Sequence, residues 1–272
     1  MRIVLWMGNE PNQKALAHKI AKNHEVVGIV VETRISKRKL TPGQFIDKAI
    51  GKLFLGKINN SWNYQRAFYQ KKYPSFPELS TLDIENINDE KVIDFTKGLK
   101  PDLIVVSGTR LIKNKTLSIR PSKGIINLHT GLSPYVKGGP NCTNWCISTS
   151  QFHLIGNTIM WIDEGIDTGN LIATECTSLD SNDDLNEVHL KVMEHAHDLY
   201  VRSIDTIKNG DVPNVKQSNI AAGTTYYTRQ WNLKSKIDLV RNLKKFRAEI
   251  NSEETKSKQS ALVLVNLSGA KD

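Results

Sequence analysis

The sequence predicts an α/β protein whose central sheet is mostly parallel and flanked by helices. Short apolar runs, of the kind that form strands buried on both faces, alternate with segments whose apolar residues recur at helical spacing. The first three segments are a predicted strand, helix and strand at 2–8, 13–23 and 25–32, with short connections. Such a unit requires parallel strands joined by a right-handed crossover, and it therefore predicts a parallel sheet.

The remaining elements continue this alternation. Their apolar and β-branched content predicts further strands at 101–108, 124–129, 157–163 and 170–179. Helices are predicted at 44–73, 87–101 and 183–209. Asn88 is the expected N-cap of the second of these helices, and Gly210 ends the third, which is long and amphipathic.

The chain is predicted to form one α/β domain over residues 1–210, followed by a small C-terminal extension over 211–272. Within the extension we expect a segment that covers an edge of the domain, a basic helix, a disordered stretch and a strand-like tail, at 214–232, 235–250, 251–260 and 261–267 respectively. Because an exposed apolar strand promotes aggregation, the tail is expected to pair with a sheet edge or with a second copy of the chain in a homodimer.

Composition indicates a soluble protein of a reducing compartment. At 272 residues the chain can bury a large core without a metal or disulfides. Three cysteines give no even-numbered disulfide framework, and the N-terminal apolar run is too short for a signal peptide or a membrane span. We therefore expect a cytoplasmic protein with no membrane partner. Cys142 and Cys146 lie four residues apart, but no further ligand has a metal-binding spacing, so we expect core residues and no metal site.

One basic segment accounts for the net charge of the chain. The formal charge is +9, and the segment from Arg34 to Lys72 contains ten basic residues and one acid, Asp47. Such a segment can bind a phosphate-bearing ligand or form a solvated basic face, and both interpretations remain open.

Two polar residues that end the strand at 124–129 are the strongest candidates for chemistry. Asn127 and His129 are two apart on a strand, so their side chains leave the same face. Ligands of parallel α/β sheets bind beyond the carboxyl ends of the strands. The Gly/Pro-rich loop at 131–140 leaves room for a ligand at this end.

A carboxylate from the loop at 162–169 can join these residues if the strands on either side of the loop lie next to His129. The acids of this loop are Asp163, Glu164 and Asp167. Acyl transfer to an amine needs a hydrogen-bond donor for an oxyanion and a group that manages a proton. Asn127 can donate to the oxyanion, and His129 can manage the proton or donate when charged. A buried Asp167 would raise the pKa of His129 and hold its ring.

Two runs of the sequence, NLHTGLSPYVKGG at 127–139 and NTIMWIDEGIDTGNLIA at 157–173, together resemble the signature of the folate-dependent formyltransferase family. That signature is Asn-x-His, a Leu/Pro loop with a basic residue and Gly, then an apolar strand and Asp-Glu-Gly-x-Asp-Thr-Gly. The resemblance covers about residues 1–210, including KPDLIVVSGTRLI at 100–112. It implies a Rossmann-like formyltransferase fold, an enzyme, and 10-formyltetrahydrofolate as the formyl donor.

The resemblance also implies roles for individual residues. The catalytic residues would be Asn127, His129 and Asp167. The pterin of the donor would lie against Arg110, Leu111 and Ile112 and against the loop residues Ile162, Asp163, Glu164 and Gly165. The sequence departs from the family in two places. The family loop commonly reads His-Pro-Ser-Leu-Leu-Pro, whereas His129 is followed here by Thr130, Gly131, Leu132, Ser133 and Pro134, and Met160 stands where many members carry a second His.

The segment after the loop bears on the acceptor amine. GGPNCTNWCI at 138–147, in which Pro-Asn is followed by Trp145, is most similar to the sugar-nucleotide formyltransferases. This similarity implies direct attack by the primary amine of a nucleotide-linked amino deoxysugar, as used for bacterial surface polysaccharide such as the lipopolysaccharide O-antigen. The candidate substrate-binding residues are Lys137, Asn141 and Trp145, of which the last can pack on a base or sugar.

Other functions remain open at this point. Glycinamide ribonucleotide or methionyl-tRNA can be the acceptor in this family, although the extension is short for a tRNA-binding domain and the purine enzymes usually lack such a tail. A non-catalytic nucleotide-binding module is a further alternative, but WMGNEPNQ after the first strand lacks the G-x-G-x-x-G pattern. No nucleic-acid partner is expected.

Overall fold

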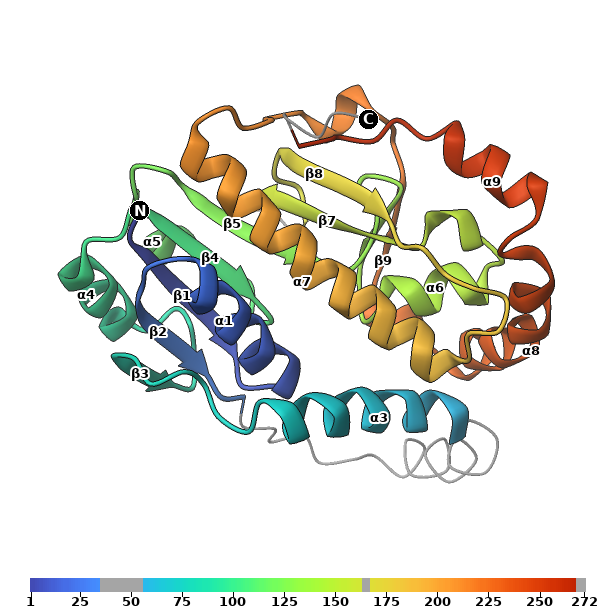
Figure 1. Cartoon of the computed structure of the whole chain (residues 1–272), viewed down its shortest axis with the longest axis horizontal. Coiled ribbons are helices and arrows are strands. Elements are labelled where there is room, and N and C mark those ends of the chain that lie inside the picture. Colours follow the sequence, from blue (N-terminus) through green and yellow to red (C-terminus); the bar gives the residue numbers. More distant parts are fainter. Residues whose placement is uncertain (35–55, 163–166, 268–272) are drawn as a thin grey trace.

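The computed structural model describes residues 1–34, 56–162 and 167–267, and it contains a twisted central sheet covered by helices (Figure 1). The sheet has seven strands in the order β3-β2-β1-β4-β5-β7-β8. These strands are β1 (Ile3–Gly8), β2 (Val26–Glu32), β3 (Thr81–Ile84), β4 (Leu103–Ser107), β5 (Ile125–His129), β7 (Gly156–Trp161) and β8 (Leu171–Cys176). The strands from β3 to β5 are parallel, whereas β7 runs antiparallel to both of its neighbours. The prediction of a mostly parallel sheet is therefore confirmed.

Helices cover both faces of the sheet. They are α1 (Pro11–Asn23), α3 (Gly56–Lys72), α4 (Glu90–Leu99), α5 (Asn114–Leu117), α6 (Cys142–Ser148), α7 (Leu185–Asn209), α8 (Leu233–Glu249) and α9 (Glu253–Ser260). The buried side chains of β1 alternate between the two faces, as a pleated strand requires. Leu5 packs in a cluster with Leu16 of α1 and Leu199 of α7, and Trp6 packs in a second cluster with Val92 of α4. None of the described helices is long and apolar enough to cross a membrane.

Local signals explain where two of the helices begin. The N-cap of α4 is Asp89 rather than the predicted Asn88, because the Asp89 carboxylate accepts the N–H of Lys91 at 2.9 Å. Helix α7 begins with a capping box between Asp184 and Glu187 and ends at Gly210, which has the left-handed φ of 103° that glycine tolerates.

Two predicted segments differ from the structure. The helix predicted at 44–73 is described from Gly56 onward as α3, and its first part lies outside the described residues. The disorder predicted at 251–260 is wrong, because α9 occupies most of this stretch. Ser252 caps α9, and Lys256–Glu253 and Lys258–Glu254 pair along its surface. A polar composition that suggests disorder thus belongs here to a capped helix with local ion pairs.

The C-terminal residues lie against the domain. Val215 forms a bridge with Leu171 of β8, and β9 (Thr224–Tyr226) pairs in parallel with β6 (Val136–Gly138). The basic helix predicted at 235–250 is confirmed as α8, which packs on α6. The tail at 261–267 is not a regular strand, but Val265 exchanges hydrogen bonds with Thr174 of β8, so the tail lies beside this sheet edge.

Candidate functional site

The site lies at the end of β5, where the sheet changes from parallel to antiparallel pairing. Asn127 is opposite Val106 of the parallel neighbour β4 and opposite Met160 of the antiparallel neighbour β7. The loop between β7 and β8 returns to this end and brings Asp167 to His129, with 3.3 Å between Asp167 Oδ2 and His129 Nδ1. The predicted approach of a carboxylate from this loop to His129 is therefore confirmed.

The environment of His129 favours its charged form. The side chain is buried, which lowers its pKa, but the Asp167 carboxylate and the Cys142 sulfur, 3.4 Å from Nε2, outweigh this effect. Together they raise the pKa of His129 to about 9. At neutral pH the imidazole therefore carries a proton on each nitrogen, and Asp167 holds the ring by its Nδ1 side.

The loop after His129 passes so close to the imidazole that it needs glycine. A Cβ on Gly131 would lie 2.4 Å from His129 Nε2 and 2.7 Å from Cys142 Sγ. A larger residue at 131 would displace the ring or the thiol, which gives a local physical reason for the glycine at this position of the loop. Met160, the second departure, is buried and lines the cavity described next.

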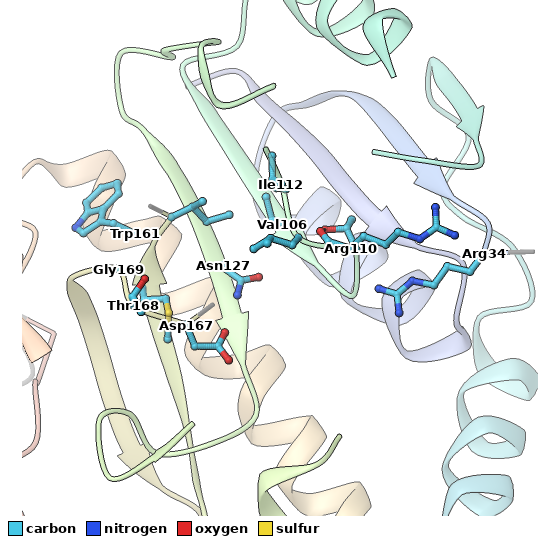
Figure 2. A pocket seen from close by; sticks show the side chains of 13 residues that line it. Arg34, Val106, Arg110, Ile112, Asn127, Trp161, Asp167, Thr168 and Gly169 are labelled. Atoms are coloured by element: carbon cyan, nitrogen blue, oxygen red, sulfur yellow. The ribbon is translucent and has the colours of Figure 1, made fainter. Parts of the chain in front are cut away.

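A first cavity of about 420 Å³ opens between the ends of β4, β5 and β7 (Figure 2). Its walls combine apolar side chains with polar groups, namely Val106, Leu111, Ile112, Met160, Trp161 and Ile162 together with Arg34, Thr109, Arg110, Asn127 and Asp167. Four of the residues predicted to hold the donor, Arg110, Leu111, Ile112 and Ile162, therefore line one cavity with Asn127 and Asp167. The other three, Asp163, Glu164 and Gly165, lie outside the described residues.

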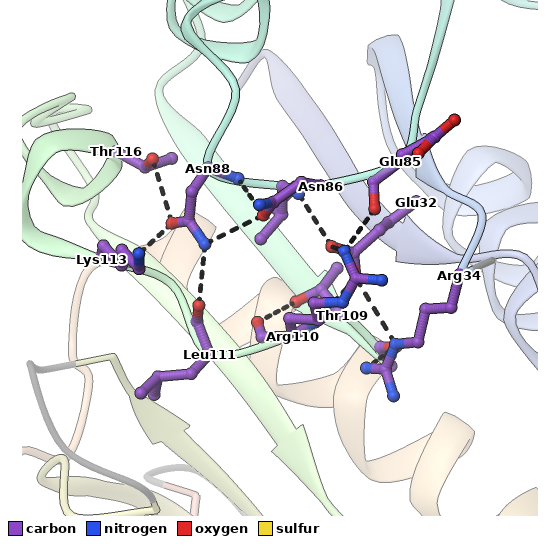
Figure 3. A network of polar contacts seen from close by, with 12 residues as sticks. Glu32, Arg34, Glu85, Asn86, Asn88, Thr109, Arg110, Leu111, Lys113 and Thr116 are labelled. Atoms are coloured by element: carbon purple, nitrogen blue, oxygen red, sulfur yellow. Dashed lines mark hydrogen bonds and ion pairs between the residues drawn. The ribbon is translucent and has the colours of Figure 1, made fainter. Parts of the chain in front are cut away.

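A buried carboxylate that sequence reasoning missed fixes one wall of the first cavity (Figure 3). Glu32, at the end of β2, accepts the backbone N–H of Arg110 and of Ile87, both at 2.8 Å. Its oxygens also lie 3.6 Å from the guanidinium groups of Arg34 and Arg110. The only indication of this role in the sequence is that Glu32 is a single acidic residue at the end of an otherwise apolar strand. Its partners, Ile87 and Arg110, are distant in sequence and come close only in the folded chain.

A second cavity of about 330 Å³ lies on the other side of His129. It is bordered by the start of α1, by the ends of β4 and β5 with the segments that follow them, by the start of α6 and by α7, and its lining includes Asn12, Gln13, Ser107, His129, Asn141, Cys142 and Met193. The order of the sheet reverses between β1 and β4, and such a point is where open α/β sheets bind ligands. Thr109 lines both cavities, so the Asn127, His129 and Asp167 group stands at their junction.

Of the three predicted substrate-binding residues, only Asn141 lines one of the two cavities described above. Asn141 borders the second cavity, although its side-chain oxygen also caps α6 by accepting the N–H of Asn144. Lys137 lies on β6 and is not among the described residues that line either cavity. Trp145 is 5% exposed, stacks on Tyr226 at 4.3 Å between ring centroids and donates its indole N–H to Gly139. This packing describes a core aromatic residue rather than an open platform for a base.

Comparison with known proteins gives a family-level match. Residues 1–204 match the family model described as formyl transferase. A methionyl-tRNA formyltransferase from Clostridium beijerinckii is 35% identical over 142 residues, which are 52% of this chain and 44% of that protein. The matched region of this chain therefore covers less than half the length of this curated relative.

Solved structures of similar fold cover more of the chain. A 4-N formyltransferase from Francisella tularensis matches 89% of this chain and 87% of its own, with a TM-score of 0.54 and 21% identity. An N-formyltransferase from Helicobacter canadensis, solved with folinic acid and dTDP-3-aminofucose, matches 89% and 81%, with a TM-score of 0.54 and 16% identity. At these identities the likeness establishes the fold.

Proposed function

Because the chain belongs to the formyl transferase family, we propose that it transfers a formyl group from 10-formyltetrahydrofolate to the primary amine of a nucleotide-linked amino deoxysugar. The observation that carries this proposal is the pairing of His129 with Asp167 at the junction of two cavities, with Asn127 in the wall of the first. One cavity can take the donor and the other the acceptor, so that the two reactants meet beside the same three side chains.

The first cavity has the chemistry that a pterin needs. Apolar walls suit the faces of a flat heteroaromatic ring. The Arg110 N–H is bonded to Glu32, so the backbone of Leu111 and Ile112 and the Asn127 amide would supply polar groups for its edge. In this proposal Arg110, Leu111, Ile112 and Ile162 hold the donor. The bound donor would supply a formyl carbon attached to a nitrogen leaving group.

The three side chains then have separate roles. The acceptor nitrogen forms a bond to the formyl carbon and releases one proton to solvent. The bond from that carbon to the donor nitrogen breaks, the donor nitrogen gains a proton from His129, and His129 regains one from solvent. The Asn127 amide can donate a hydrogen bond to the oxygen that gains negative charge. His129 is already protonated at neutral pH, so we assign it to oxyanion stabilisation and to proton donation to the leaving nitrogen rather than to removal of the first proton. Asp167 keeps the imidazole charged and oriented.

The choice of a sugar acceptor is supported by the solved neighbours. The Helicobacter protein was solved with dTDP-3-aminofucose, a nucleotide-linked amino sugar, and its fold matches 89% of this chain. Methionyl-tRNA is the competing acceptor, because several relatives that match by sequence, such as those from Clostridium beijerinckii and Fusobacterium nucleatum, carry that name. Glycinamide ribonucleotide is the third candidate within the same chemistry.

An amine screen distinguishes these acceptors. The purified chain is mixed with 10-formyltetrahydrofolate and each amine in turn, and release of tetrahydrofolate is followed. Turnover with a nucleotide-linked amino sugar, and not with the free sugar, is the expected result. Turnover with methionyl-tRNA or glycinamide ribonucleotide alone would contradict the proposed acceptor and keep the formyl-transfer chemistry. A chain that binds nucleotide-linked sugars but turns over no amine would support the non-catalytic alternative.

A further inference from the structure

A residue of the C-terminal extension contacts the loop that carries Asp167. Gln217 donates its side-chain N–H groups to the backbone oxygens of Asp167 and Gly169, both at 2.8 Å. We propose that Gln217 is a positioning residue that fixes Asp167 beside His129, so that the extension completes the active site. This inference rests on the proposed function of Asp167.

The loop needs such support because of its backbone conformation. Asp167 has a φ of 53°, in the left-handed region that residues with a side chain rarely adopt. Strained conformations persist only where surrounding contacts hold them. The amide of Gln217 is suited to this task because one NH2 group can donate to two carbonyl oxygens at once. It thereby fixes the Asp167–Thr168 and Gly169–Asn170 peptide groups.

Gln217 is buried within the extension. Its side chain is 8% exposed and lies in a short 3-10 turn, Gln217–Asn219. Two residues earlier, Val215 exchanges backbone hydrogen bonds of 2.8 and 3.0 Å with Leu171, the first residue of β8. The extension therefore forms hydrogen bonds both with the Asp167 loop and with β8, the strand that follows this loop.

The same part of the extension also supports the opposite side of Asp167. The Asp167 carboxylate accepts the N–H of Gly138 at 3.3 Å, and Gly138 belongs to β6, which pairs with β9 of the extension. Tyr226 of β9 accepts the N–H of Gly139 at 3.0 Å. The carboxylate and the backbone of Asp167 are thus both held, directly or through β6, by residues between 215 and 226.

The chemical consequence of loosening this support is measurable at His129. Among the described residues, the ionisable groups that face His129 are Asp167 from the loop and Cys142 from α6. If Asp167 moves away, the imidazole keeps its burial and loses its main stabilising charge, so its pKa falls. Gln217 does not touch the donor cavity wall from Arg110 to Ile112, but Asp167 and Gly169 line the same cavity, so the KM for the donor should rise together with the loss of kcat.

The test compares Gln217→Met with Asn219→Met in the full chain. Methionine keeps the length of glutamine and removes its donor group, and Asn219 is an exposed residue of the same turn. The His129 pKa is measured by NMR titration, and kcat and KM are measured with the accepted amine. We expect Gln217→Met to lower the His129 pKa and to reduce kcat by about tenfold to a hundredfold. Asn219→Met should match the wild type in both measurements.

Two further variants make the outcomes separable. Asp167→Asn should lower the His129 pKa whatever Gln217 does, and an unchanged pKa in this variant would refute the role given to Asp167 in the proposed function. Wild-type pKa and kcat in Gln217→Met, alongside a lowered pKa in Asp167→Asn, would overturn the present inference alone. If Gln217→Met does not fold, Gln217→Asn takes its place, because the shorter amide cannot reach both carbonyls; the same two readings support or overturn the inference.

Discussion

At the residue scale, the proposed reaction depends on the close contact between His129 and Asp167. Replacing His129 by Ala removes the charge that stabilises the oxyanion, and we expect kcat to fall by about 10²–10⁴-fold. Asp167→Asn should also remove most of the activity, because a neutral amide cannot keep the buried imidazole charged. Both variants should retain the wild-type circular dichroism spectrum.

His153→Ala is the matched control for this prediction. His153 is a partly exposed histidine of the 3-10 turn at Phe152–Leu154, and it lines neither cavity. Burial and the charge of Lys258 lower its pKa, whereas Asp167 raises that of His129. Its replacement should leave kcat unchanged. Near wild-type rates in His129→Ala or in Asp167→Asn would remove that residue from the mechanism.

The raised pKa of His129 gives the pH dependence of the reaction. Its folded-state pKa is about 9, above the value of about 6.5 of an unperturbed histidine, so the charged form persists through neutral pH and is lost as the pH rises through about 9. We expect kcat to fall on this alkaline side, and the fall should move to lower pH in Asp167→Asn. The stability that the ion pair contributes should be complete below pH 6.5 and disappear over the same rise. A kcat that increases with pH through 9 would show that neutral His129 acts as a base instead.

At the element scale, the wall of the first cavity depends on contacts among three separate loops. Glu32 joins the end of β2, the segment before α4 and the segment after β4 through its bonds to Ile87 and Arg110. In Glu32→Gln the amide can accept only on one side, so one of these buried N–H groups loses its partner, at a cost of about 1–3 kcal/mol. We expect the KM for the formyl donor to rise about tenfold, with a smaller change in kcat.

Glu25→Gln is the control for Glu32→Gln. Glu25 immediately precedes β2, its side chain is largely exposed, and it pairs loosely with Arg2 at 3.5 Å. The same chemical change there should leave donor binding unaltered. Equal KM values for the donor in Glu32→Gln and in the wild type would mean that the wall does not depend on this carboxylate.

Elements with strong periodic signals could be predicted from the sequence. Short continuous apolar runs such as 3–8 and 103–107 are typical of interior strands that are buried on both faces. Helix α7 combines a periodic apolar face with a capping box at its start and a glycine at its end. Strand β3 was missed because its residues are exposed or half-buried and carry no such pattern. Asn88 was expected to cap α4, but its side chain instead binds the backbone of Leu111 and Lys113.

The site was predictable only in part, because two kinds of information are involved. Asn127, His129 and Asp167 sit in local runs that the resemblance could identify, and β-strand alternation places the first two on one face. Glu32 and Gln217 are single polar residues whose partners are distant in sequence, so only the folded chain reveals their contacts. For Trp145 the sequence suggested a ligand-binding role that the folded chain does not support. Its ring stacks on Tyr226 and so has this face covered by protein.

At the scale of the whole molecule, the C-terminal extension and the domain form one continuous structure around the site. Two cavities meet at the end of β5, and the extension borders this region through β9 and Gln217 (Figure 1). Farther along, its tail lies beside β8, the outermost strand of the seven. A sheet edge exposes unpaired backbone groups that promote association with other chains. We therefore expect the tail both to stabilise the fold and to limit self-association through the β8 edge.

Two valines of the tail allow this role to be tested with one chemical change. Val265 is 6% exposed and exchanges hydrogen bonds with Thr174, whereas Val263, two residues earlier, is 59% exposed. Val265→Asp places an unpaired carboxylate in an apolar site and should cost on the order of 3 kcal/mol, lowering Tm by about 6–12 °C. Val263→Asp should leave Tm within a degree or two, since its side chain already faces solvent. Size-exclusion chromatography should show larger species for Val265→Asp alone, because release of the tail uncovers the β8 edge; equal Tm and elution in the two variants would show that the tail does not protect this edge.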